Sequence, residues 1–68
     1  MINQINKRIL ELQTELSEVR LDINVIKRAN PETFENEADY KLLKIDEKRI
    51  HLVIETNKEI RDRIIESL

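Results

Sequence analysis

The feature that most constrains the fold of this chain is a ladder of aliphatic residues near its N-terminus. Its members are spaced alternately by three and four residues without a break, and they are Ile2, Ile5, Ile9, Leu12, Leu16, Val19, Ile23 and Ile26. In a helix this heptad spacing gathers on one narrow face. A helix over about residues 2–29, about 40 Å long, cannot shield such a face from water by itself. The ladder therefore predicts a long helix packed against another helix.

The only proline, Pro31, marks the point at which this first helix must end, in a chain that has no glycine. Proline lacks an N–H group and forces the preceding residue out of the helical conformation. Asn30 is suited to cap a second helix whose first position is Pro31, and Asn36 offers a later start. We expect a turn over about residues 30–36 and a second helix over about residues 37–67, with the earlier start at Pro31 left open.

The short connection predicts that the two helices are antiparallel. A chain of 68 residues makes one small domain, and a core of that size is marginal without disulfides, a metal or oligomerisation. There is no cysteine, so self-association is the aid that remains. We therefore expect an all-α domain over residues 1–68, an antiparallel two-helix coiled-coil hairpin that dimerises into a four-helix bundle.

The second helix carries aliphatic residues over more than half of its circumference, which is wider than one neighbouring helix requires. A weaker second stripe on the first helix holds Leu10, Leu21 and Val25. The residues expected to form the apolar seam and this surplus face are Ile9, Leu12, Leu16, Val19, Ile23, Leu43, Ile50, Val53, Ile54, Ile60, Ile64 and Ile65. More than one neighbour is therefore predicted for the second helix.

Two polar residues, Asp46 and Asn57, interrupt the apolar face of the second helix. A buried polar group is costly unless it is hydrogen-bonded, and in coiled coils one such residue often fixes register and oligomeric state. We expect this register role for both residues, with Arg20 and Arg49 as the charge partners of Asp46.

No arrangement of residues predicts an enzyme. Glu47, His51 and Glu55 are spaced by four residues, but their stripe is expected to point away from the apolar face, where solvated ion pairing is the ordinary role. No phosphate-binding loop and no nucleophile with an adjacent base occurs. We expect no catalytic residue, no metal and no cofactor.

The net charge of −2 does not favour nucleic acid as a partner. Acidic residues concentrate between residues 30 and 40, where they suit the positive end of the second helix. The N-terminus lacks the long apolar run of a signal peptide or membrane span, so a cytoplasmic location is expected by default.

These features together predict a small non-enzymatic protein–protein interaction module, such as a regulator, adaptor or inhibitor. Small size and a composition rich in Ile, Asn, Lys and Glu suggest a phage or mobile-element origin. The alternative is a dimeric helical hairpin that binds nucleic acid. Its phosphate contacts would be Lys7, Arg8, Lys27, Arg28, Lys48 and Arg49.

Overall fold

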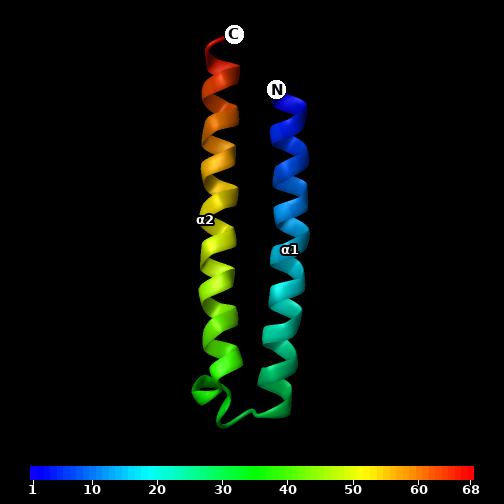
Figure 1. Ribbon diagram of the computed structural model, residues 1–68, viewed down its shortest axis with the longest axis vertical. Coiled ribbons are helices and arrows are strands. Elements are labelled where there is room, and N and C mark those ends of the chain that lie inside the picture. The colour runs from blue at the N-terminus through cyan, green and yellow to red at the C-terminus, as the bar shows by residue number, and fades with distance from the viewer.

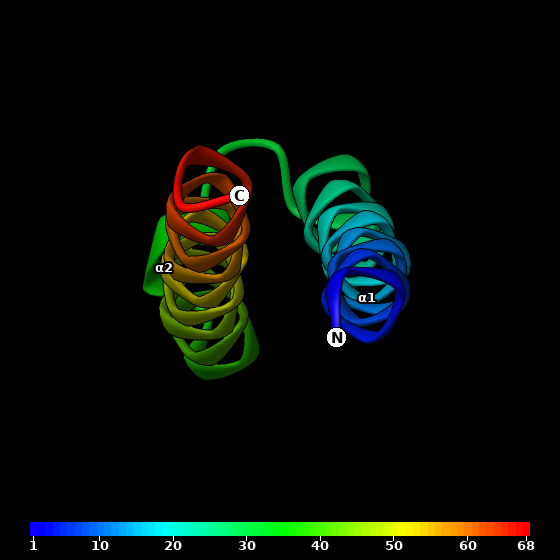
Figure 2. The same cartoon turned by 90° about the horizontal axis from the view of Figure 1, so that it is seen from above.

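The computed structural model describes all 68 residues as two long α-helices joined by a short 3₁₀ turn. The elements are α1 (Ile2–Ala29), η1 (Phe34–Asn36) and α2 (Ala38–Glu66). The helices run antiparallel and side by side in a rod of 52 × 15 × 13 Å (Figure 1). The view along the rod shows α1 and α2 as a single layer (Figure 2). The all-α hairpin expected from the sequence is confirmed.

The aliphatic ladder of α1 faces α2 along its whole length. Its central members Ile9, Leu12, Leu16 and Ile23 are buried, with relative exposures of 3–7%. The other four members are half-buried. Because no residue of the ladder is fully exposed, the heptad spacing places α2 against this one face of α1.

The turn differs in detail from the expected capping. Asn30 ends α1 rather than starting α2: its N–H donates to the carbonyl of Ile26 (3.0 Å), and its own carbonyl accepts from Phe34 N (2.8 Å). Pro31 therefore lies in the turn, and α2 begins at Ala38, the later of the two expected starts. Its N-cap is Glu37, which makes no side-chain capping hydrogen bond. The carbonyl of Asn30 accepts from Phe34 N as it would at a helix start, but the following bonds span only three residues (Asn36 N to Thr33 O, 2.9 Å), so no α-helix continues from Pro31.

Two aromatic rings pack at this end of the hairpin. Phe34 and Tyr40 meet edge to face with ring centroids 5.1 Å apart, and the Lys27 ammonium lies 5.5 Å from the centre of the Phe34 ring. Edge-to-face aromatic pairs and cation–π contacts are both attractive. They link the last turn of α1, η1 and the first turn of α2.

The face of α2 that meets α1 is narrower and more polar than the sequence suggested. The α2 residues that are buried or half-buried at heptad spacing are Leu43, Glu47, Ile50, Ile54, Asn57, Arg61 and Ile64. Only Ile50 and Ile54 among them are fully buried. The continuous core therefore lies in the middle of the hairpin, where these two residues pack against Ile9, Leu12 and Leu16.

Two polar contacts across the helices define their register. Arg20 on α1 donates to Glu47 on α2 (3.3 Å), and Arg61 on α2 donates to Asn6 on α1 (3.3 Å). The C-terminal end of α2 extends beyond the start of α1 (Figure 1). Ile65 is consequently half exposed and Leu68 is fully exposed.

We expect Leu16→Asp to unfold the hairpin. Leu16 is buried in the central core, so the substitution removes about 1.5–3 kcal/mol of apolar burial and places an unpaired charge there. Glu55→Ala is the matched control because Glu55 is exposed and pairs only with Lys58 at 3.7 Å, a contact whose loss changes stability by a few tenths of a kcal/mol. Thermal unfolding followed by circular dichroism compares the two variants. Equal midpoints would show that Leu16 does not lie in the core.

Candidate interaction surface

The second helix presents an exposed apolar surface that α1 does not cover. We define the α2 stripe by its residues: Leu42, Ile45, Arg49, Leu52, Val53, Thr56 and Ile60. Its five aliphatic members are 39–63% exposed. Isolated exposed apolar residues are common on soluble proteins, whereas a continuous row of them is characteristic of binding sites.

The α2 stripe is one face of the helix and is separate from the seam. At 100° per residue its members lie within an arc of about 100°, centred about 130° from the line of Leu43, Ile50 and Ile54. It extends over about 27 Å from Leu42 to Ile60 at 1.5 Å per residue. Because α1 packs against one side of α2, it does not contact the residues in this arc, and the α2 stripe remains exposed to solvent.

The first helix offers less apolar surface. Leu10, Leu21 and Val25 are 63–65% exposed, and they lie on the side of α1 opposite its ladder. They match the weaker second stripe expected from the sequence, but a separation of eleven residues divides Leu10 from Leu21. The continuous exposed row is therefore on α2 alone.

A shallow groove joins the two helices near the turn. It has a volume of about 450 Å³ and is lined by Asp22, Val25, Ile26, Asp39, Leu42 and Leu43. Leu42 belongs both to this groove and to the α2 stripe, so the apolar surface continues from the face of α2 into the space between the helices. Asp22 and Asp39 give the groove an acidic rim.

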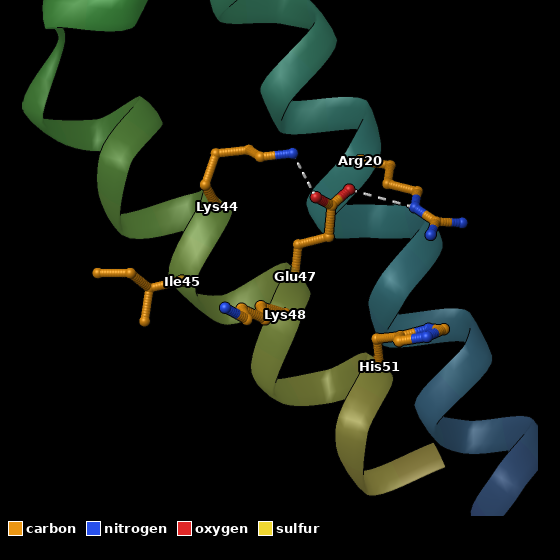
Figure 3. Close-up of a pocket in the computed structure, with 6 residues that line it drawn as sticks. All are labelled: Arg20, Lys44, Ile45, Glu47, Lys48 and His51. Atoms are coloured by element: carbon orange, nitrogen blue, oxygen red, sulfur yellow. Dashed lines mark hydrogen bonds and ion pairs between the residues drawn. The ribbon is translucent and has the colours of Figure 1, made fainter. Parts of the chain in front are cut away.

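A second groove, of about 580 Å³, is polar and centres on Glu47. Its lining residues are Arg20, Lys44, Ile45, Glu47, Lys48 and His51. Arg20 from α1 and Lys44 from α2 converge on the Glu47 carboxylate, whose oxygens lie 3.3 Å from Arg20 Nε and 2.6 Å from Lys44 Nζ (Figure 3). Ile45 points away from this cluster, toward the side of the α2 stripe (Figure 3).

These contacts alter the ionisation of Glu47 and Lys44. The hydrogen bond from Lys44 lowers the pKa of the Glu47 carboxyl, partial burial opposes it, and the hydrogen bond from Arg20 adds to the lowering. The same hydrogen bond and the negative charge of Glu47 raise the pKa of the Lys44 ammonium. Both groups are therefore held in their charged forms around neutral pH, and the carboxylate engages Arg20 and Lys44, two of the three lysine and arginine side chains that line the groove.

The residues expected in the seam and surplus face fall into three groups. Ile9, Leu12, Leu16, Ile23, Ile50 and Ile54 are buried. Val19, Leu43 and Ile64 are half-buried at the edges of that core. Val53, Ile60 and Ile65 are exposed, so they belong to the uncovered surface.

The expected register residues do not bridge the helices. Asp46 has a side chain that is 43% exposed and pairs with Arg49 on its own helix at 3.0 Å, not with Arg20. Asn57 is half-buried, and its amide donates to the carbonyl of Val53 (2.8 Å), also on α2. The polar contacts between helices are made by Glu47 and Arg61 instead.

Glu47 is the residue that the sequence interpretation misplaced. It was expected on the solvated face with His51 and Glu55, but its side chain is only 21% exposed because it lies at a heptad position facing α1. The signal was present: Leu43, Ile50, Ile54 and Ile64 continue one heptad through Glu47, Asn57 and Arg61. A search for aliphatic residues alone does not reveal these heptad positions, because three of the seven are polar.

The polar side chains with metal-ligating or nucleophilic groups are dispersed along the two helices. No group of three or more His, Cys, Asp or Glu side chains converges as metal ligands. Ser17 and His51 line the same shallow groove, but the Ser17 hydroxyl donates to the carbonyl of Gln13 (3.0 Å). The hydroxyls of Thr14 and Thr56 likewise bond to carbonyls one turn earlier.

No family model, curated protein or solved structure matches this chain. None of its helices combines the length and the apolar character needed to cross a membrane.

Glu47→Gln should destabilise the hairpin by on the order of 1 kcal/mol or less at neutral pH, because it weakens a partly exposed ion-pair network. The folded-state pKa of Glu47 is lowered, so the contribution of its charge is complete above the ordinary value of 4.5 and is lost as the pH falls through the folded value. The stability difference between wild type and Glu47→Gln should accordingly shrink on acidification.

Urea unfolding at neutral pH and at a pH below the folded pKa of Glu47 measures this difference. Glu59→Gln is the control, because Glu59 is exposed and makes no ion pair. A gap between wild type and Glu47→Gln that stays constant with pH would contradict the assigned role of Glu47.

Proposed function

We propose that this chain is a non-enzymatic protein–protein interaction module, acting as a small regulator, adaptor or inhibitor. The observation that carries the proposal is the α2 stripe, a row of exposed side chains, five of seven aliphatic, on one face of a helix whose other face is already packed. Recognition through a helix face uses residues at this spacing. Burial of such a row excludes water from apolar surface, which is the main driving force of protein association.

The total surface of the hairpin supports the same proposal. The chain exposes 5391 Å², whereas a compact monomer of 8.2 kDa exposes about 4,500 Å². The excess of roughly 850 Å² arises because a two-helix rod has only one layer, and it is close to the 800 Å² that each partner buries in a stable complex. One further packing partner would bring the chain to the surface area of an ordinary globular protein.

The simplest form of this proposal is self-association of two hairpins into a four-helix bundle. Six buried residues form the entire core of one hairpin, and none of them is less than 3% exposed. A core of this size contributes little stability, and oligomerisation is a common way for small domains to enlarge it. A second hairpin would cover the α2 stripe and add a second apolar layer.

The nucleic-acid alternative receives less support from the arrangement of charges. The candidate phosphate contacts lie on both helices and at different levels of the rod, from Lys7 near one end to Lys27 at the other. Arg8 and Arg49 are paired with Glu11 and Asp46, respectively. Lys27 lies over the Phe34 ring. A continuous unpaired basic face, which phosphate binding favours, is not formed by these residues.

Sedimentation equilibrium tests the proposal at micromolar concentration with wild type, Leu52→Glu and Leu21→Glu. We expect wild type to sediment well above 8.2 kDa. Leu52→Glu should be monomeric, because it places a charge in the middle of the α2 stripe. Leu21→Glu is the matched control: Leu21 has similar exposure but lies on α1 outside the stripe, so this variant should behave as wild type.

Affinity capture with wild-type chain, with and without nuclease and at low and high salt, covers the case of a different partner. Phosphate-driven binding falls steeply with salt, whereas an apolar interface does not. The proposed function would be overturned if the chain were monomeric and captured no protein whose binding is lost in Leu52→Glu. Capture of RNA or DNA alone, lost in high salt, would favour the nucleic-acid alternative.

A further inference from the structure

The α2 stripe has a composition suited to burial along its whole length. Its two polar members already have partners in the same helix. The Thr56 hydroxyl donates to the carbonyl of Leu52 (2.9 Å), and Arg49 pairs with Asp46 at 3.0 Å. Covering Thr56 would therefore leave no unpaired hydroxyl, and the long aliphatic stem of Arg49 can pack while its charged end stays in water.

Two pairs of residues in the α2 stripe are placed evenly about position 51. Leu42 and Ile60 lie nine residues on either side of it, and Arg49 and Val53 lie two residues on either side. A two-fold axis at this position brings the members of each pair together twice, because residue i of one copy meets residue j of the other and j meets i. When two copies of α2 cross antiparallel at position 51, Leu42 of one copy lies opposite Ile60 of the other. Leu52 then lies beside Leu52 of the second copy.

The charge of Arg49 distinguishes this orientation from a parallel one. In a parallel pair each residue faces its own counterpart, so the two Arg49 side chains would meet, and their like charges at the edge of the interface are unfavourable. In the antiparallel pair Arg49 lies opposite Val53 of the second copy, where its stem can pack. Arg49 therefore selects the antiparallel arrangement.

From this geometry we propose that the α2 stripe binds the α2 stripe of a second copy, antiparallel, about a two-fold axis beside Leu52. The proposal rests on the proposed function and adds the partner, the helix and the register. The hairpin as a whole exposes roughly 850 Å² more than a compact monomer of its mass, which is close to the area that each partner buries in a stable dimer.

The absence of cysteine from the chain allows a direct test with single-cysteine variants and a short bis-maleimide crosslinker. Leu52→Cys should form a crosslinked dimer in high yield, because the two positions 52 meet at the axis. Leu42→Cys alone should not, because its two copies would lie about 27 Å apart along the helices. Ile60→Cys alone should also stay uncrosslinked. A mixture of Leu42→Cys with Ile60→Cys should restore the crosslinked product.

Leu10→Cys, on the outer face of α1, is the control for random collisions and should give no dimer. Circular dichroism checks that each variant keeps the helical content of wild type. A strong product from Leu42→Cys alone would overturn the antiparallel register. Absence of product from Leu52→Cys in a sample that sediments as a dimer would overturn this interface while the proposed function stands. A chain that is monomeric and binds no protein through Leu52 would overturn both.

Discussion

Burial of the α1 ladder against α2 is the interaction on which the rest of this molecule depends. Neither helix has a second neighbour, so water is excluded only along the line where the two seams meet. The apolar contact is concentrated at mid-length, where Ile50 and Ile54 face Ile9, Leu12 and Leu16. Toward the ends, the aromatic pair near the turn and the Arg61–Asn6 contact near the termini continue the association of the helices.

The two seams have unequal roles. The α1 ladder is wholly aliphatic, and such a ladder packs almost equally well after a shift of one heptad along its partner. The α2 seam includes Glu47, Asn57 and Arg61, which interrupt the aliphatic line at fixed positions. Glu47 meets Arg20 and Arg61 meets Asn6 in only one alignment, and a shifted alignment would lose both contacts, leaving Glu47 with Lys44 and Arg61 with Asp62 on α2 alone. Polar contacts therefore favour one register, at some cost in apolar burial.

A single-layer hairpin has a direct consequence for its outer surface. Each helix can bury only the face that meets its neighbour, and any further apolar row remains exposed. On α2 that row is continuous and lies about 130° from the seam, an angle that leaves room for another helix beside it. The polar groove around Glu47 lies on another side of α2, and its charges are largely satisfied within the chain. The exposed apolar residues and the polar contacts to α1 thus occupy different faces of one helix.

The sequence by itself determined the helices, their approximate ends and their antiparallel association. It could do so because the ladder from Ile2 to Ile26 and the break at Pro31 are local patterns, which depend only on the 3.6-residue period of the helix and on the chemistry of proline. The surplus of apolar residues on α2 was also visible as a periodicity. These features do not require knowledge of what lies opposite a given residue.

Only the tertiary structure decided which part of the broad apolar face of α2 meets α1. The face of α2 that packs against α1 depends on how the two helices are aligned. That face includes polar residues, which a pattern of aliphatic residues does not reveal. Glu47 consequently faces α1, although the sequence placed it on the solvated face, and Asp46 pairs with Arg49, one of its two expected partners, but not with Arg20 on α1. The turn also required three-dimensional information, because Asn30 can cap either helix, and only the three-residue hydrogen bonds that follow it show that α2 does not begin at Pro31. The periodicity of apolar residues identifies the apolar face of a single helix. Which residues of two such faces meet is decided only when the helices pack together.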